Sequence, residues 1–294
     1  MNRQANQQVN RPAQHAAVEA VNSWLQMADG QPLFVRDWPL PDARGAVLLV
    51  HGLGEHGGRY QRLAQWFNAR GYAVRCHDQR GHGRTPGRRG ALRRADNLLT
   101  DLTAVYGAYA DTCATAPLLL GHSLGGLVAA RCVLDRRIMP PALLLSSPAL
   151  RTYEPRVLQR LAALLTPLLP NLPLRSALPF AWLSHDPQVV AAYRDDPLRT
   201  GWITPRLADF IFRTGARCVA DAAMLGVPTL LLIAGADRLV DPHGSQDFST
   251  AAMATGQLTT RTFDTLYHEL FNEAEPGRGQ VFARLADWLA RQGA

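Results

Sequence analysis

The sequence predicts an α/β protein in which a mostly parallel central sheet is flanked by helices and carries an inserted helical cap. From about residue 46 onwards, short continuous apolar runs alternate with segments of helical periodicity, which is typical of a parallel sheet covered on both faces. The alternation lapses between residues 151 and 221, where Leu and Pro are abundant, and then resumes. A length of 294 residues, 47% of them apolar, suits one such domain with an insertion.

The predicted elements follow one another in a regular order. Residues 17–27 and 32–38 alternate in polarity around the turn-like residues 28–31, which predicts an antiparallel pair. Buried strands are predicted at 46–50, 72–76, 117–120, 142–145, 228–234 and 258–263, and helices at 60–70, 96–110, 124–135, 156–165, 206–216, 243–253 and 279–291. The expected organisation is a disordered tail of residues 1–16, a core of residues 17–150 and 222–294, and a helical cap of residues 151–221.

The charged residues exclude several kinds of site. All 31 basic residues are arginine, so no lysine can serve as a nucleophile, form a Schiff base or hold phosphate in a P-loop. The net charge of +7 is concentrated between Arg70 and Arg94, where eight arginines accompany one acid, Asp78. Such a segment is either a solvated loop or a basic patch that attracts phosphate, an anionic membrane surface or an acidic partner. No aromatic, zinc-finger or heptad pattern accompanies it, so we expect no nucleic-acid partner.

The cysteines and the apolar stretches indicate a cytoplasmic protein, with a peripheral position at the inner membrane as the alternative. The four cysteines are widely spaced and form no C-x-x-C pair, which favours reduced thiols. Residues 1–15 contain no apolar run of the kind found in signal peptides. Four prolines and Arg175 interrupt residues 157–183, which excludes a membrane span there. The sequence predicts no oligomeric state.

A candidate nucleophile lies at residues 121–126, Gly-His-Ser-Leu-Gly-Gly, which join a predicted strand to a predicted helix. In this context the pattern G-x-S-x-G places the serine, here Ser123, in a strained turn above the sheet. Gly121 and Gly125 allow neighbouring backbone to approach that turn closely. The helix N-terminus behind Ser123 offers free N–H groups to a developing oxyanion.

A serine hydroxyl needs a base, and the base needs an acid that orients it. The expected chain order is Ser, acid, His, and His268 follows the last predicted strand. Asp237 follows the preceding strand and is our predicted acid. Asp241 and Asp264 are the alternatives. Asp241 precedes a proline at the start of a predicted helix, so its side chain has an N-capping role already.

An oxyanion hole requires two N–H groups. The loop after the first buried strand, residues 51–55, has glycines on both sides of Leu53. We therefore predict that the amides of Leu53 and Leu124 form the oxyanion hole. The histidines nearby form no metal-ligand spacing, so we expect no metal. Residues 52–57 match G-x-G-x-x-G, but no acidic strand end accompanies them, which argues against a dinucleotide.

Several motifs together identify a family. They are residues 51–56 (His-Gly-Leu-Gly-Glu-His), 59–60 (Arg-Tyr), 78–83 (Asp-Gln-Arg-Gly-His-Gly), 121–126, 147–148 (Ser-Pro), 237–242 (Asp-Arg-Leu-Val-Asp-Pro) and 267–270 (Tyr-His-Glu-Leu). From about residue 45 to residue 289, the chain resembles the α/β-hydrolase superfamily. Within it, the chain is similar to the monoacylglycerol lipase and lysophospholipase group, the serine aminopeptidase S33-like hydrolases.

The resemblance implies roles for individual residues. By position it implies Ser123 as nucleophile, Asp237 as acid, His268 as base, Leu53 and Leu124 as oxyanion donors, and residues 151–221 as a cap. It also implies that Glu55 and Arg59 lie near the polar head of the substrate. An ion pair that merely holds the oxyanion loop is the alternative for these two residues.

We therefore expect a bacterial serine hydrolase that cleaves carboxylic esters of single-chain lipids, with monoacylglycerols as the main substrate and without a cofactor. Lysophospholipids or simple carboxylic esters are alternative substrates. A peptidase, an amidase, a thioesterase or a non-catalytic binding scaffold are further alternatives. The apolar residues of the cap suit an acyl chain, transient contact with a lipid surface, or packing of the cap on the core.

Overall fold

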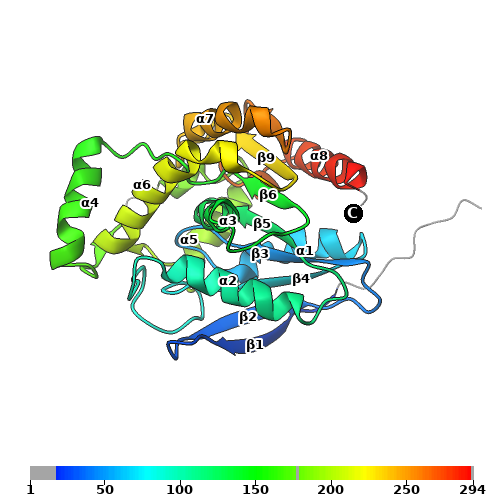
Figure 1. Ribbon diagram of the computed structural model, residues 1–294, viewed down its shortest axis with the longest axis horizontal. Coiled ribbons are helices and arrows are strands. Elements are labelled where there is room, and N and C mark those ends of the chain that lie inside the picture. The colour runs from blue at the N-terminus through cyan, green and yellow to red at the C-terminus, as the bar shows by residue number, and fades with distance from the viewer. Residues whose placement is uncertain (1–17, 177–178, 293–294) are drawn as a thin grey trace, which may run out of the picture.

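Eight strands form the central sheet of the computed structural model, which describes residues 18–176 and 179–292 (Figure 1). Their order is β1-β2-β4-β3-β5-β6-β9-β10. The strands are β1 (Val21–Gln26), β2 (Pro32–Trp38), β3 (Gly45–Val50), β4 (Tyr72–His77), β5 (Leu118–His122), β6 (Leu143–Ser146), β9 (Thr229–Ala234) and β10 (Leu258–Phe263). β2 is antiparallel to β1 and β4, whereas the remaining neighbours are parallel. The predicted α/β class and the initial antiparallel pair are confirmed.

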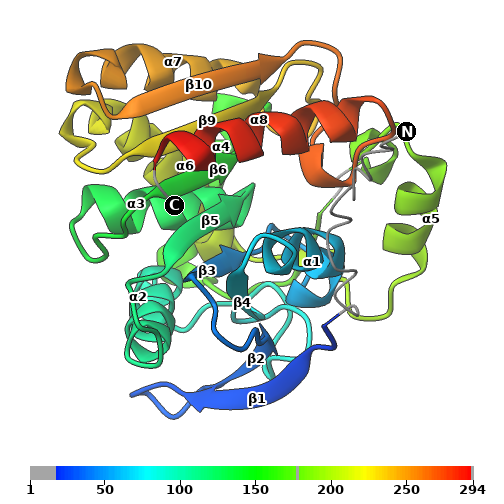
Figure 2. The ribbon, with the colours of Figure 1, turned by 90° about the vertical axis from the view of Figure 1, so that its right-hand side faces the viewer.

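Helices cover both faces of this sheet (Figure 2). One face is packed by α1 (Gln61–Asn68) and α8 (Gly277–Arg291), and the other by α2 (Asn97–Ala110), α3 (Leu124–Leu134), α6 (Pro205–Ala220) and α7 (Pro242–Ala252). Successive residues of a strand point to opposite faces, and in β3 Leu48 joins the second layer while Leu49 joins the first. Both positions are fully buried, which explains why the strands read as continuous apolar runs.

The segment between β6 and β9 contains elements that do not join the central sheet. They are α4 (Arg156–Leu168), β7 (Leu174–Arg175), α5 (Pro187–Asp195), β8 (Trp202–Ile203) and α6, with β7 and β8 paired to each other. In Figure 1, α4 lies at the far end of α6, away from the strands. The buried residues Leu207, Phe210 and Cys218 of α6 belong to the core that α3 also covers. The inserted segment therefore contributes one helix to the core itself.

Further predictions concern the N-terminal tail, membrane spans, metal ligands and the cysteines. The predicted tail, residues 1–16, lies outside the described residues. Within the described residues, no helix is long and apolar enough to cross a bilayer, and no three metal-ligating side chains gather. Cys76, Cys113, Cys132 and Cys218 are free thiols.

Several of the eight arginines of residues 70–94 are engaged by neighbouring side chains. The guanidinium of Arg80 is buried between Asp29 and Asp101, and that of Arg75 forms a bidentate pair with Asp37. Arg70 stacks on a tryptophan ring, with its guanidinium carbon 3.8 Å from the centroid. The segment is therefore not a uniformly solvated loop, and apart from Arg70 its exposed arginines lie within residues 84–94.

Candidate active site

Ser123 occupies a strained turn between β5 and α3. Its backbone φ of 53° and ψ of −119° lie in a region that side chains other than glycine rarely adopt, and such a residue costs of order 1–3 kcal/mol. The Ser123 N–H donates to the carbonyl of Ser146 at 3.0 Å, which ties the turn to β6. The helix α3 begins at the next residue, so the turn lies at the carboxyl end of a central strand and at a helix N-terminus.

The glycines around the turn are required by close backbone contact. A Cβ on Gly125 would overlap the carbonyl oxygens of Val50 and His51, at the end of β3. A Cβ on Gly121 would collide with the backbone of Gly125 itself. The G-x-S-x-G spacing thus lets β3, β5 and the first turn of α3 converge at Ser123.

Asp237 and His268 form a buried pair at the same edge of the sheet. Asp237 follows β9 and His268 follows β10, and Asp237 Oδ2 lies 2.6 Å from His268 Nδ1. The other carboxylate oxygen accepts N–H groups from Leu239 at 2.8 Å and Val240 at 3.0 Å. Both side chains of the pair are at least 95% buried. The carboxylate therefore fixes the imidazole so that Nε2 remains available for a reacting proton.

The electrostatics of this pair favour protonation of the His268 ring. Burial opposes protonation of the ring, but the charge of Asp237 and its hydrogen bond outweigh burial and raise the pKa of His268. His122, whose ring centroid is 4.7 Å away, has its pKa lowered to about 4 by burial and by His268. Since His122 stays neutral near pH 7, His268 is the one of these two rings whose surroundings favour the doubly protonated, charged form.

The alternative acids lie elsewhere. Asp241 caps α7, where its Oδ1 accepts the N–H of His243 at 3.0 Å. Asp264 is exposed on the loop after β10. The structure thus brings Asp237 to His268, and it gives Asp241 the N-capping contact expected from the Asp-Pro sequence.

The loop that carries Leu53 is held rigidly from two sides. His51 Nδ1 donates to the Gly52 carbonyl at 2.8 Å, and its Nε2 accepts the Gln79 N–H at 2.9 Å. From the inserted segment, the Thr200 N–H donates to the Gly54 carbonyl at 2.9 Å. In the described part of the chain, neither the Leu53 N–H nor the Leu124 N–H donates to a protein acceptor. Two free N–H groups thus come from the two loops that meet at Ser123.

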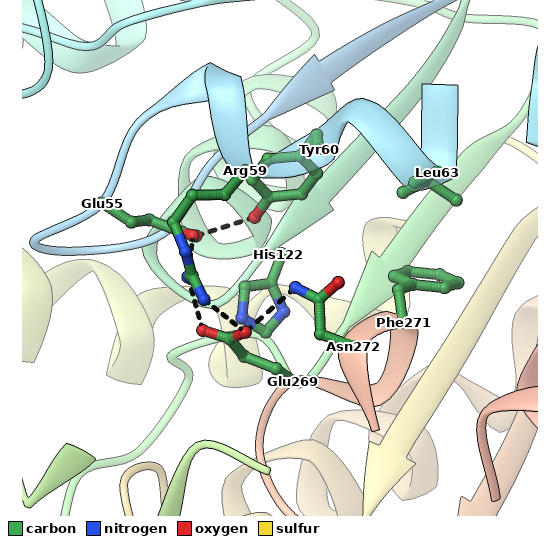
Figure 3. A pocket seen from close by; sticks show the side chains of 8 residues that line it. All are labelled: Glu55, Arg59, Tyr60, Leu63, His122, Glu269, Phe271 and Asn272. Carbon is green, nitrogen blue, oxygen red and sulfur yellow. Dashed lines mark hydrogen bonds and ion pairs between the residues drawn. The ribbon is translucent and has the colours of Figure 1, made fainter. Parts of the chain in front are cut away.

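Glu55 and Arg59 lie in a buried ion network, shown in Figure 3. Arg59 Nη1 donates to Glu55 at 2.6 Å, and the same guanidinium forms a bidentate pair with Glu269 at 2.6 and 2.8 Å. Glu55 also accepts the Gly52 N–H at 2.6 Å and the Tyr60 hydroxyl at 2.7 Å. Of the two alternatives for Glu55 and Arg59, the ion pair is present, and Glu55 ties it to Gly52 in the loop of residues 51–55. Contact with substrate stays a prediction.

Removing the guanidinium from this network should destabilise the protein. In Arg59→Met, Glu55 and Glu269 remain buried without their cation, so we expect the free energy of unfolding at pH 7.5 to fall by about 3–5 kcal/mol. Urea unfolding measures this loss.

The loss of unfolding free energy in Arg59→Met should be smaller at lower pH. In the native protein Arg59 helps to hold the pKa of Glu55 below its usual range, a stabilisation that is present above the ordinary carboxyl pKa and lost as pH falls. In the variant the unpaired carboxyls take up protons, so the difference should be smaller at pH 5. Arg160→Met, at an exposed position of α4, is the matched control, and an equal loss in both variants would contradict the prediction.

The structure also reveals positioning residues to which the sequence analysis gave no role. Buried Glu273 accepts N–H groups from Tyr267 at 2.8 Å and His185 at 2.6 Å, and the Ser184 hydroxyl at 3.0 Å. The His185 ring stacks on Tyr267, with centroids 3.5 Å apart. This carboxylate therefore ties the inserted segment to the loop that carries His268. No local signal could have found it, because its donors on the inserted segment lie 88 or 89 positions earlier in the chain.

The sequence gives little sign of the role of Glu269 beyond its place directly after His268 in the motif of residues 267–270. Arg59 belongs to a separate motif, residues 59–60, and no local pattern connects it with Glu269. The pair that Glu269 makes with Arg59 joins residues 210 positions apart.

Comparisons with known proteins identify the family of this chain. The family model described as "Serine aminopeptidase, S33" matches residues 41–275. Monoacylglycerol lipase from Mycolicibacterium smegmatis is 35% identical over 255 residues, covering 85% of this chain and 90% of the relative. Human monoglyceride lipase is 31% identical over 279 residues, covering 91% and 90%.

Solved structures show the same fold. Monoacylglycerol lipase from Paleococcus ferrophilus superimposes with a TM-score of 0.81 at 32% identity, covering 88% of this chain and 99% of that one. A monoglyceride lipase variant from Saccharomyces cerevisiae, bound to a substrate analog, superimposes with a TM-score of 0.83 at 22% identity, covering 96% of this chain and 97% of that one. At this identity the likeness shows the fold alone. The chain therefore belongs to the serine aminopeptidase S33 family of α/β-hydrolases, in the group that contains the monoacylglycerol lipases.

Proposed function

We propose that this protein is a serine hydrolase that cleaves the ester bond of monoacylglycerols. The observation that carries the proposal is the convergence of Ser123, in its strained turn, with the buried pair of Asp237 and His268 at one edge of the sheet. The names of the relatives supply the substrate class, since both the bacterial and the human relative are monoacylglycerol lipases.

The proposed reaction follows from the roles of these groups. His268 Nε2 takes the proton of the Ser123 hydroxyl as the oxygen attacks the ester carbonyl, while Asp237 stabilises the imidazolium that forms. The amides of Leu53 and Leu124 hold the oxyanion, each worth about 3 kcal/mol of barrier. His268 then gives its proton to the leaving glycerol oxygen, and a water molecule repeats the sequence on the acyl-enzyme.

A panel of neutral and zwitterionic substrates tests the function. The expected order of kcat/KM is monoacylglycerol first, lysophosphatidylcholine lower, and an aminoacyl p-nitroanilide lowest. Release of fatty acid and of p-nitroaniline measures it. Faster cleavage of the anilide than of every lipid ester would refute the proposal.

The exposed face of α4 supports delivery of the substrate from a lipid surface. Val157, Leu161, Leu164 and Leu168 follow helical spacing and are 47–76% exposed, while Ala162 is buried on the other side of the helix. An apolar helical stripe of this kind is suited to lie in the interface of a membrane. We propose that α4 makes transient contact with lipid, in addition to packing against α6.

Polar residues on this face should weaken lipid contact without harming the chemistry. In Leu164→Ser/Leu168→Ser we expect binding to phosphatidylcholine vesicles to weaken at least about tenfold, since a buried leucine contributes roughly 1.5 kcal/mol or more. Turnover of a water-soluble short-chain ester should stay unchanged. Met253→Ser, at a residue 74% exposed outside the inserted segment, is the control. Vesicle sedimentation that gives the same result for all three proteins would contradict this role.

A further inference from the structure

Four arginines line a second cleft, which lies within the inserted segment and the loop beside it. Its volume is about 400 Å³, within the range of small-molecule sites. The lining residues are Arg89, Arg175, Arg194, Asp196, Pro197, Arg199, Thr200, Gly201 and Trp202. The cleft shares no lining residue with the small cavity of Figure 3, whose volume of about 10 Å³ has room for little more than a water molecule.

The positive charges of this arginine cleft are poorly neutralised. Asp196, the one acidic residue in its lining, has one carboxylate oxygen 2.7 Å from His56 Nε2, while the other accepts the Leu198 N–H at 2.8 Å. Arg194 pairs with exposed Asp195 outside the cleft. Across the described residues, the other three arginines of the lining form no ion pair. Three guanidinium groups are therefore left for an external anion.

Neutral contacts hold these guanidinium groups in place. Arg175 lies over the Trp202 ring at 4.6 Å, and Arg199 donates from Nε to the Arg194 carbonyl at 2.9 Å. Arg89 donates from Nη1 to the Gly83 carbonyl at 2.7 Å. Each contact uses the face or a single N–H of the guanidinium, and the remaining N–H groups stay free to donate. Like charges collected in this way repel one another unless an anion lies among them.

We propose that the arginine cleft binds a phosphate group. Guanidinium forks match the oxygens of phosphate in a bidentate manner, and several forks can share one phosphate because it presents three or more oxygens. A carboxylate has only two oxygens and fits a single fork. The buried Thr200 hydroxyl accepts the Trp202 N–H at 3.2 Å, so its own proton is left to donate. The phosphate is either free or carried on a glycerol headgroup.

This site is separate from the ester-cleaving centre but adjoins its oxyanion loop. Thr200 lines the cleft and also donates its N–H to Gly54, next to the predicted oxyanion donor Leu53. Asp196 likewise lines the cleft and binds His56 of the same loop. The proposal does not depend on the monoacylglycerol assignment, because it concerns equilibrium binding and not turnover.

Binding measurements on the full chain test the proposal. Isothermal titration with inorganic phosphate and with glycerol phosphate, and sedimentation with phosphatidylcholine vesicles with and without phosphatidic acid, distinguish the two sources. A response to inorganic phosphate indicates free phosphate, and a response only to glycerol phosphate or phosphatidic acid indicates a headgroup. Sodium chloride at equal ionic strength gives the background, since exposed charges are screened by salt.

The variants identify the cleft as the site. We expect Arg175→Gln/Arg199→Gln to bind at least about tenfold more weakly, and Arg175→Lys/Arg199→Lys to retain part of the affinity because it keeps the charge but not the forks. Arg261→Gln, at an exposed position of β10 outside both the inserted segment and the proposed lipid-contact helix, should bind as the native chain does. Circular dichroism confirms folding of each variant. The proposal is overturned if no phosphate compound binds above the chloride background, or if the glutamine variant binds as tightly as Arg261→Gln.

Discussion

Replacing Ser123 by alanine is expected to lower the hydrolysis of a short p-nitrophenyl ester by about 10⁴- to 10⁶-fold, the range over which serine hydrolases lose activity without their nucleophile. The hydroxyl is the only part of Ser123 that is removed. The turn keeps its hydrogen bond from the Ser123 N–H to Ser146, and the φ of 53° is no harder for alanine than for serine. The fold should therefore persist, and circular dichroism should match the native spectrum.

A fluorophosphonate probe gives an independent readout for Ser123→Ala. The native protein should be labelled at one residue, and the variant should not be labelled at all. Retention of more than about a hundredth of the native activity in a folded variant, well above the residual rate expected from oxyanion stabilisation alone, would remove Ser123 from the mechanism. Labelling of the native protein would at the same time exclude the non-catalytic scaffold.

Replacing Asp237 by asparagine is expected to lower kcat by about 10⁴-fold, because the amide favours the wrong tautomer of His268 and cannot stabilise the imidazolium. The pH profile should change as well. Asp237 raises the pKa of His268 whereas burial lowers it, so the pKa of the ring should fall in the variant. Since the base must be unprotonated, the acidic limb of kcat/KM should move to lower pH.

The same substitution at the neighbouring acid is the matched control. Asp241→Asn should keep both activity and stability, because asparagine caps a helix as well as aspartate does. Asp241→Ala should lose about 1 kcal/mol of stability and no activity. If Asp241→Asn were inactive and Asp237→Asn active, the acid would be Asp241 and the contact between Asp237 and His268 would be incidental.

Much of the fold could be read from the sequence because its signals are local. Strands such as β3 and β5 are buried on both faces and are therefore continuously apolar, and the helices between them keep their periodicity. The elements of the inserted segment are harder to predict from the sequence. Its strands β7 and β8 have two residues each, and α5 begins after Asp186 with only an Asp-Pro cap to announce it. Such short elements have too few residues for a periodic pattern.

The choice of Asp237 over Asp241 could also be made from the sequence. A carboxylate directly after a strand lies at the edge of the sheet where the other motifs end, whereas an Asp-Pro step begins a helix. Both expectations concern neighbours within a few positions of each residue. The structure adds the 2.6 Å contact with His268 across 31 positions.

The ion pairing of Glu55 and Arg59 depends on Glu269, which no local pattern in the sequence connects with them. The sequence left two alternatives open, and the contact with Glu269 gives the guanidinium a second carboxylate. The arginine-rich segment is similar. Its positive charges are close together along the chain. In space, however, Arg80 is neutralised in the core, and Arg89 lies beside arginines of the inserted segment.

The sequence by itself determined the order along the chain of the core strands and helices, the turn that carries Ser123, and the residues that could serve as base and acid. These depend on periodicity, glycine spacing and capping, which act over a few residues. Only the tertiary structure decided how the charged groups are paired and which of them remain free. The reason is that Arg59 and Glu269, or Arg89 and Arg175, are brought together by the packing of distant elements, and the strength of a charge depends on that three-dimensional neighbourhood.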